Sequence, residues 1–369
     1  MVSVLIVNYF CHALTARAVA SALADDPAAQ VIVVDNSDDP DESRALRGNL
    51  PASVECLIAP ANLGFGRACD LALEHARGEW IFLLNPDATV LPGCLARLVA
   101  TLHCHPRAGA VSPVSQWDAT GSFLLPPGQM QTPAWEWLLS LGMRFPALGR
   151  LLSKRFRAWA LACLHAPRPV CQSMLSGAHT LLRRQAVDAI GGLFDPGFFM
   201  YYEDTDLCRR LAAAGFDLLL DPCARVVHEW RNDPGKNRFV ANSRRRYLDK
   251  HFPRTWLTES RRLRMERLLR QRPAFATIDL GLCHSPPVFN LASQQTGQWL
   301  LEISPCPLFV PAAYCTASAA PHCVPPNIWE LLGEGGYWAR LTAPGGQELV
   351  FSWEVPDTSP RCSGNESGH

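Results

Sequence analysis

Short apolar runs alternate with longer, helix-compatible stretches along the first part of the chain. Continuous apolar runs of the kind found in buried strands occur at residues 2–7 (VSVLIV), 31–34 (VIVV) and 80–84 (WIFLL). Strands that alternate with helices predict a mostly parallel sheet that is covered by helices on both faces. We therefore expect an α/β fold for this part of the chain.

Polar residues follow each of these three runs directly. They are Asn8 and Tyr9 after the first run, Asp35–Ser37 after the second and Asn85–Asp87 after the third. The carboxyl ends of parallel strands lie at one edge of a sheet, where open α/β sheets bind their ligands. The three polar clusters are therefore predicted to converge on one crevice.

The middle of the chain is basic and helix-compatible. Residues 144–168 contain six basic residues and no acidic one, and apolar residues recur there at helical spacing, Phe156 and Trp159 among them. This pattern predicts a basic amphipathic helix. Its apolar side, with Phe156 and Trp159, would either lie on an anionic membrane surface or pack against the rest of the domain. Residues 244–272 form a second basic stretch that is also helix-compatible.

The composition changes at Pro273, beyond which basic residues become rare and short β-like segments appear. We expect three parts: residues 1–250 as the main α/β domain, 251–272 as a basic helical linker, and 273–369 as a small β-rich domain of unknown role. The polar segment that ends the chain is expected to be disordered.

Composition narrows the class of protein. The chain has 369 residues, of which 48% are hydrophobic and 18% charged, so it can bury a substantial core and is neither fibrous nor disordered. No uncharged apolar run reaches the roughly 18 residues that a membrane span needs, and the 14 cysteines are scattered. These features predict a cytoplasmic protein in a reducing environment. Its basic segments accompany no known nucleic-acid-binding motif, so we expect no nucleic-acid partner.

Asp87 ends the Asn-Pro-Asp sequence that follows the third apolar run. A carboxylate at the carboxyl end of a strand is well placed to hold Mg²⁺ or Mn²⁺, which proteins bind through a few carboxylates together with substrate phosphates. The alternative is an ordinary Asn-Pro-Asp turn without a ligand.

Three acidic residues, Glu203, Asp204 and Asp206, follow the apolar segment 198–202 and begin a predicted helix. Acids in a first helical turn can simply cap the helix. An apolar neighbourhood also raises the pKa of a carboxyl group, which is what a general base requires. His228 follows a further apolar stretch, either as a metal ligand or as a hydrogen-bonded structural residue.

The order of these motifs resembles family 2 glycosyltransferases with a GT-A fold, and especially their bacterial rhamnosyltransferase and galactofuranosyltransferase-like branch. The matching elements, in order, are Val7–Tyr9, Val34–Ser37, Asn62–Gly66, Leu84–Asp87, Ser176–Ala178 with Leu181–Arg184, Gly191–Asp195, Phe199–Leu207 and His228. They span roughly residues 2–250. The resemblance implies a Rossmann-like central sheet flanked by helices, followed here by the β-rich extension.

The resemblance also implies a role for each matching residue. At the catalytic site, Asp204 would be the base and Glu203 would orient acceptor or donor hydroxyl groups. Asp87 and His228 would bind the Mg²⁺ or Mn²⁺ ion. The nucleotide-sugar donor would be bound by Asn8, Tyr9, Asp35, Asn36, Asn62, Gly64, Asn85 and Asp87. The acceptor would contact Gly177, Ala178, Asp206 and Trp230. Asn85 stands where much of the family has an aspartate.

The activity implied is an inverting, metal-dependent transfer of a sugar, for example one of the rhamnose type, from a nucleoside diphosphate to a hydroxyl group. The acceptor would be a saccharide or lipid-linked molecule of cell-surface polysaccharide assembly, which would place the protein at the inner face of the membrane. The alternative is a catalytically silent protein that binds sugar nucleotides or serves as a scaffold.

Overall fold

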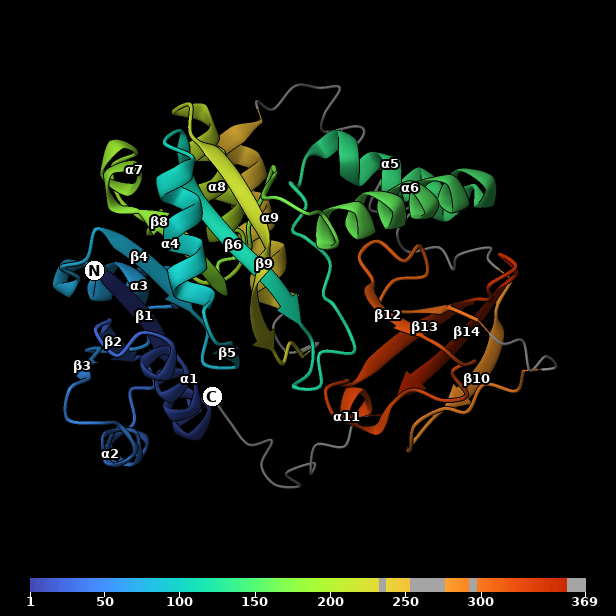
Figure 1. Ribbon diagram of the computed structural model, residues 1–369, viewed down its shortest axis with the longest axis horizontal. Coiled ribbons are helices and arrows are strands. Elements are labelled where there is room, and N and C mark those ends of the chain that lie inside the picture. Colours follow the sequence, from blue (N-terminus) through green and yellow to red (C-terminus); the bar gives the residue numbers. More distant parts are fainter. Residues whose placement is uncertain (232–236, 253–275, 292–296, 357–369) are drawn as a thin grey trace, which may run out of the picture.

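The computed structural model describes residues 1–231, 237–252, 276–291 and 297–356. A large sheet forms the centre of the N-terminal part, and a smaller sheet lies at the C-terminal end (Figure 1). The predicted linker lies outside these ranges except for its first two residues, and so does the predicted disordered end.

The central sheet has the strand order β3-β2-β1-β4-β8-β6-β9-β5, with β7 paired to β9. Its strands are β1 (Val2–Asn8), β2 (Gln30–Asp35), β3 (Glu55–Ile58), β4 (Trp80–Leu84), β5 (Ala88–Val90), β6 (Ala108–Gln116), β7 (Val170–Cys171), β8 (His179–Arg183) and β9 (Asp217–His228). Strands β3, β2, β1 and β4 are mutually parallel, as is the pair β6 and β9, and the remaining pairings are antiparallel. The expected α/β class is confirmed, with parallel strands joined to antiparallel ones.

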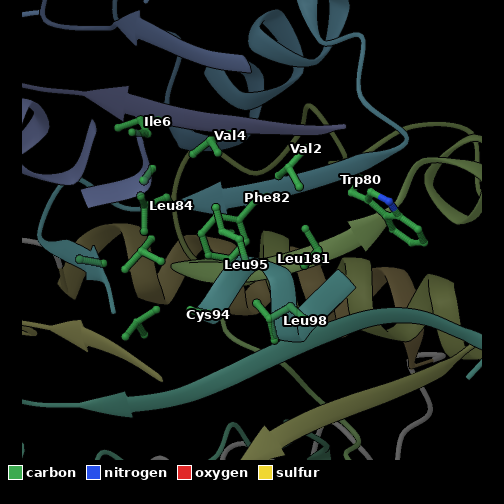
Figure 2. Packing of buried hydrophobic residues seen from close by; sticks show 14 of the residues in the cluster. Val2, Val4, Ile6, Trp80, Phe82, Leu84, Cys94, Leu95, Leu98 and Leu181 are labelled. Carbon is green, nitrogen blue, oxygen red and sulfur yellow. The ribbon is translucent and has the colours of Figure 1, made fainter. Parts of the chain in front are cut away.

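Helices cover both faces of this sheet. The helices of this part of the chain are α1 (His12–Asp25), α2 (Pro40–Asn49), α3 (Phe65–His75), α4 (Cys94–Cys104), α7 (Arg184–Ala189), α8 (Glu203–Ala213) and α9 (Asn237–His251). In β1, Val4 and Ile6 pack into one hydrophobic cluster with residues of α1 and α4, as Figure 2 shows for part of it. Leu5 and Val7 pack into a second cluster with α3 and α8. Burial on both faces explains why the strands are continuously apolar.

The C-terminal part forms a five-stranded sheet of order β10-β14-β13-β11-β12. Its elements are β10 (Ile278–Leu282), β11 (Trp299–Ser304), β12 (Ala313–Ala317), the short helix α11 (Pro326–Trp329), β13 (Gly335–Thr342) and β14 (Glu348–Val355). Aromatic side chains, among them Tyr337, Phe351 and Trp353, fill a separate core. The β-rich character expected for this part is confirmed.

Two helices, α5 (Pro133–Arg144) and α6 (Pro146–Leu164), form a hairpin beside the C-terminal sheet (Figure 1). The basic helix expected here is confirmed as α6. Its apolar side faces inward: Phe156 is only 4% exposed, and Trp159 packs against the same core. The suggestion that these two side chains lie on a membrane is therefore wrong, because the protein itself covers them.

A buried ion network joins α6 to the C-terminal sheet. Arg340 of β13 donates two hydrogen bonds, of 2.6 and 2.5 Å, to the fully buried carboxylate of Glu302 in β11. The same arginine donates to Ser153 of α6, and Arg157 of α6 lies 2.7 Å from Glu302 and 2.9 Å from Glu348. Each buried charge thus has a partner across the contact between helix and sheet.

Replacement of Glu302 by Gln should destabilise the fold, because it leaves the buried Arg340 guanidinium without a compensating charge. Loss of one partner of a buried ion pair typically costs about 3–5 kcal/mol. The free energy of unfolding, measured by urea titration with tryptophan fluorescence, should fall by an amount in this range. The exposed Glu330→Gln provides the matched control. A change below about 1 kcal/mol for Glu302→Gln would contradict the role given to this network.

Candidate active site

The carboxyl ends of β1, β2 and β4 meet at one edge of the central sheet. In the parallel register, Asn8 pairs with Asp35 and Leu5 pairs with Leu83. The turn that begins at Asn85 therefore lies beside the ends of β1 and β2. The predicted convergence of the three polar clusters is confirmed.

Asn8 and Asp35 form a buried polar network at this edge. The Asn8 side-chain amide donates to Asp35 Oδ1 at 3.2 Å and to Glu42 Oε1 at 3.0 Å. Burial tends to raise the pKa of Asp35, but hydrogen bonds from Ser43, Ser37 and Asn8 outweigh it and hold the pKa below its ordinary value. Asp35 is therefore an ionised acceptor at neutral pH. Tyr9, by contrast, is largely exposed at the same edge.

The loop that contains Asn62 and Gly64 is tied to the same edge. The Asn36 side-chain amide donates to Asn62 Oδ1 at 3.0 Å. Gly64 has φ +79°, and a Cβ at this position would collide with the carbonyl oxygen of Phe199, which also accepts a hydrogen bond from the Phe65 backbone at 2.9 Å. The loop thus connects the ends of β1 and β2 to the aromatic segment before the acidic residues.

Asp87 and His228 are brought together by the pairing of β5 with β9. Ala88 pairs with His228, and the Glu229 backbone donates to the Asp87 carbonyl at 3.0 Å. His228 Nε2 lies 3.4 Å from Asp87 Oδ1. Asn85 Oδ1 is buried and has no hydrogen-bond partner within the described ranges.

These donor atoms fit a hard divalent cation. Two ligands of one Mg²⁺ ion, each about 2.1 Å from it, can lie as far apart as the 3.4 Å between Asp87 Oδ1 and His228 Nε2. The buried, unpartnered oxygen of Asn85 offers a further oxygen donor nearby. In the part of the chain that the structure describes, no three His, Cys, Asp or Glu side chains are grouped to hold a metal.

The acidic residues begin α8 after an unusual backbone segment. Tyr201 and Tyr202 both adopt the left-handed region, with φ of +69° and +65°, which non-glycine residues rarely occupy. The centres of the Tyr202 ring and the Tyr247 ring of α9 lie 5.4 Å apart, and the Ser243 hydroxyl donates a hydrogen bond to the Met200 carbonyl. Packing against α9 therefore maintains the turn that places the acids.

Glu203 and Asp204 have environments that favour their protonated forms. Glu203 is almost completely buried, and its Oε2 has no hydrogen-bond partner among the described residues. Burial, reinforced by the neighbouring Asp204, raises the pKa of Glu203 to about 8. Burial also raises the pKa of Asp204, against hydrogen bonds from the Gly177 and Thr205 backbones. At neutral pH Glu203 therefore carries a proton beside Asp204, and the two titrate as a pair.

Asp204 is linked to the Asn-Pro-Asp turn through the segment before β8. Gly177 N donates to Asp204 Oδ2 at 3.2 Å, and Ala178 O accepts from Asn85 N at 2.8 Å. The pairing of Leu84 with His179 continues this contact into the sheet. The structure thus brings Asp87, His228 and Asp204 to one region, with Gly177 and Ala178 between them.

A pocket with a volume of about 160 Å³ adjoins this region. His228, Trp230 and Ser176, the neighbour of Gly177, are among the residues that line it. The segment Leu125–Gly128 also contributes to its wall. Sequence reasoning did not identify this segment, because nothing in its composition marks it and only the tertiary fold places it here.

Asp206 has a different environment from the one expected. Its carboxylate is fully buried and is bonded to Arg210 at 2.8 Å, Lys250 at 2.7 Å and His251 at 2.6 Å. Although burial tends to raise it, these hydrogen bonds hold the pKa of Asp206 below its ordinary value. The expected acceptor contact is corrected: Asp206 joins α8 to α9 and exposes no oxygen to a ligand.

His179 is a residue of this region that sequence reasoning missed. It is buried in β8, with Ser112 Oγ 3.1 Å from its Nδ1 and Ser115 Oγ 2.6 Å from its Nε2. Burial and the nearby His228 lower the pKa of His179 to about 3, so the ring is neutral. The centres of the His179 and His228 rings lie 5.3 Å apart. The only sequence signal was its position directly after Ser176–Ala178.

The chain is similar to known glycosyltransferases. Residues 3–150 match the family model "Glycosyl transferase family 2". An N-acetylglucosaminyl-diphospho-decaprenol L-rhamnosyltransferase of Mycobacterium tuberculosis is 31% identical over 232 residues, which are 58% of this chain and 71% of the relative.

Similar solved structures include a mannosyltransferase of Pyrobaculum calidifontis in complex with GDP-Man and Mn²⁺. Its TM-score is 0.45 at 19% identity, covering 73% of this chain and 69% of that one. GalNAc-T7 with UDP, GalNAc and Mn²⁺ has a TM-score of 0.44 at 17% identity, and the match covers 72% of this chain and 54% of that chain. The sequence match to the rhamnosyltransferase, which extends over more than two thirds of its length, confirms the expected family. The chain belongs to glycosyltransferase family 2.

Proposed function

We propose that this glycosyltransferase moves a rhamnose-like sugar from a nucleoside diphosphate to a hydroxyl group, with inversion at the anomeric carbon. The acceptor is a saccharide or a lipid-linked saccharide of cell-surface polysaccharide assembly. The observation that carries the proposal is the link from Asp204 through Gly177 and Ala178 to the turn of Asn85 and Asp87. It supports a base at Asp204 close to a diphosphate site at Asn85 and Asp87. The name of the mycobacterial relative supports the choice of sugar and of acceptor.

The edge formed by β1, β2 and β4 would bind the donor. The ionised Asp35 and the amides of Asn8, Asn36 and Asn62 provide polar groups for a base and a ribose. Gly64 keeps the loop close to the sheet edge, and Tyr9 offers an exposed ring. These groups would hold the nucleotide while its diphosphate extends toward Asn85 and Asp87.

Asp87 and His228 would hold a Mg²⁺ or Mn²⁺ ion at the diphosphate. Once bound, such an ion stabilises the negative charge that develops on the departing diphosphate. Asn85 presents a neutral oxygen where a second carboxylate would add charge, so the site relies on Asp87 for its negative charge.

Asp204 would remove the proton from the attacking hydroxyl. Its raised pKa makes it a stronger base than an exposed aspartate, and the Gly177 backbone orients its Oδ2. The protonated Glu203 adds no second negative charge to the pair at neutral pH. A base that lies across the sugar from the leaving diphosphate directs attack from the opposite face, which gives inversion.

The pocket beside His228 would accept the acceptor saccharide. Trp230 offers an apolar face and Ser176 a hydroxyl group, and both line the pocket. Gly177 and Ala178 lie between this pocket and the donor edge. A sugar bound here would direct a hydroxyl group toward Asp204.

A lipid-linked acceptor places the protein in the cytoplasm, at the inner face of the membrane. In the ranges that the structure describes, no helix has the length and apolar character needed to cross a bilayer. We propose that a surface of the described fold contacts the membrane.

Replacement of Asp204 by Asn should suppress turnover by at least about a hundredfold, because positioned proton transfer typically contributes 10²- to 10⁴-fold. Affinity for the nucleoside diphosphate should stay within about twofold, since the amide keeps the size of the side chain. Donor-dependent sugar transfer and calorimetric titration measure the two effects. The exposed Asp188→Asn is the control. Undiminished turnover in Asp204→Asn would remove this residue from the mechanism.

The buried Glu203 should make stability depend on pH. The unfolded chain releases this proton near pH 4.5, whereas the folded protein keeps it up to about pH 8. Stability is therefore lost as the pH rises through that window. Between pH 5 and pH 8 the free energy of unfolding should fall less for Glu203→Gln, which cannot ionise, than for the wild type. The two decreases should differ by more than about 1 kcal/mol. Denaturant unfolding at both pH values measures this difference, and identical losses would contradict the proposed burial of the proton.

Metal dependence can be read from binding, apart from catalysis. Mg²⁺ or Mn²⁺ should strengthen nucleoside diphosphate binding at least about tenfold, and EDTA should abolish the gain, because Asp87 and His228 would hold an ion that offsets the negative charge of the diphosphate. Asp87→Asn should remove most of this gain, whereas Asp217→Asn, on the same sheet, should retain it. Calorimetry with and without each metal gives the affinities. Equal metal responses in Asp87→Asn and wild type would exclude Asp87 as a ligand.

A further inference from the structure

We propose that the outer face of the α5–α6 hairpin is the surface by which the protein docks on an anionic lipid membrane. This inference rests on the proposed function, since a lipid-linked acceptor is presented at such a surface. We call the surface the hairpin face. It consists of Trp137, Arg144, Phe145, Arg150, Leu151, Lys154 and Arg155.

Large apolar side chains on the hairpin face are exposed to solvent. Trp137 is 40%, Phe145 52% and Leu151 51% exposed. Phe145 lies in the turn between the two helices, and Leu151 lies in the second turn of α6. Figure 1 shows the hairpin extending from the central sheet, beside the C-terminal sheet. Exposed apolar side chains that gather on one protruding element typically mark an interaction site.

Basic side chains lie near Phe145 and Leu151. Residues four apart lie on the same side of a helix, so Lys154 lies near Arg150, and Arg155 near Leu151. The four side chains are all exposed. The Arg144 guanidinium lies 5.7 Å from the centre of the Phe145 ring. Apolar groups flanked by arginine and lysine are the composition of helices that lie in the interfacial region of an anionic bilayer.

The hairpin's own sequence brings little negative charge to this basic surface. Between residues 119 and 187 the sequence has one acidic residue, Glu136. Its carboxylate is bound by Arg244 of α9 at 2.5 Å and is mostly buried. The exposed charge of the hairpin is therefore of one sign, which complements an anionic lipid surface. The exposed apolar side chains at the turn favour lipid over nucleic acid as the partner.

The opposite side of the hairpin is fixed to the protein. Leu152 and Phe156 are buried, and Arg157 forms ion pairs with Glu302 and Glu348 of the C-terminal sheet. These contacts prevent α6 from turning its inner, larger apolar side outward. The hairpin face is therefore presented in one orientation by a rigid support.

The base of the hairpin lies close to the acidic residues of the site. Glu136, in the first turn of α5, binds Arg244 of α9, and Gln131 accepts a hydrogen bond from Tyr247 at 3.0 Å. Tyr247 contacts Tyr202, the residue before Glu203. Helix α5 has 12 residues, so it spans roughly 18 Å at about 1.5 Å per residue. A membrane docked on the hairpin face would thus lie within reach of the site.

Vesicle flotation tests this assignment with the full-length protein. Wild type should float with phosphatidylcholine vesicles that contain phosphatidylglycerol, and much less with phosphatidylcholine alone. Each basic residue near such a surface contributes about a fivefold gain in affinity. Arg150→Gln with Lys154→Gln should therefore weaken binding by at least about tenfold, and Phe145→Ser with Leu151→Ser should weaken it by a similar factor.

Matched controls change exposed residues of the same kinds elsewhere. Arg44→Gln with Arg77→Gln removes two exposed charges, and Leu282→Ser with Val288→Ser removes two apolar side chains that are 57% and 59% exposed. Both controls should bind vesicles as the wild type does. Unchanged thermal midpoints and nucleoside diphosphate affinity in the two hairpin variants confirm that they are folded.

Two results would overturn the proposal. If the wild type stays unbound with both neutral and anionic vesicles, membrane docking is excluded. If the hairpin variants float as well as the wild type does, the hairpin face is excluded as the docking surface. Preferential binding of the hairpin to RNA or DNA would name a different partner. None of these outcomes bears on the transfer chemistry, which Asp204→Asn tests with a water-soluble acceptor, where the hairpin variants should remain active.

Discussion

The pairing of β4 with β8 is the contact on which the site depends. Backbone hydrogen bonds hold the end of β4 against the start of β8, so that Asn85 meets Ala178. The preceding residue, Gly177, in turn holds Asp204. A backbone contact at Asn85 and a side-chain contact at Asp204 thereby bring residues that are far apart in the sequence to one region. This antiparallel pairing joins the parallel strands β3, β2, β1 and β4 to the part of the fold that holds Glu203 and Asp204.

Buried carboxyl groups in this protein differ in their protonation because their partners differ. Asp35 and Asp206 are both fully buried, yet hydrogen bonds from amides, hydroxyls or cations keep their pKa values low. Glu203 lacks such partners on one oxygen within the described ranges, and its pKa rises to about 8. Burial alone therefore does not set the charge. Asp35 and Asp206, whose pKa values are low, thus differ from Glu203 and Asp204, whose pKa values are raised and which titrate as a pair.

The parallel half of the sheet and its polar edge could be predicted from the sequence, because a strand buried on both faces is continuously apolar and its end is marked by polar residues. Strands β8 and β9 gave weaker signals, and no local pattern shows that β8 lies between β4 and β6. The role of His179 and that of the segment 125–128 therefore stayed hidden. Asp206 was misjudged because its partners Lys250 and His251 come from α9. Periodicity showed that α6 is amphipathic, but not that its apolar side meets the C-terminal sheet.

A crystal structure with Mn²⁺ and a nucleoside diphosphate tests the central claim most directly. The account predicts anomalous scattering from Mn²⁺ beside Asp87 and His228, with the diphosphate on the ion and the base at the edge formed by Asn8 and Asp35. The Asp204 carboxylate should face the open side of the diphosphate. Mn²⁺ and nucleotide bound away from Asp87, or an Asp204 side chain with no path to the diphosphate, would contradict the account.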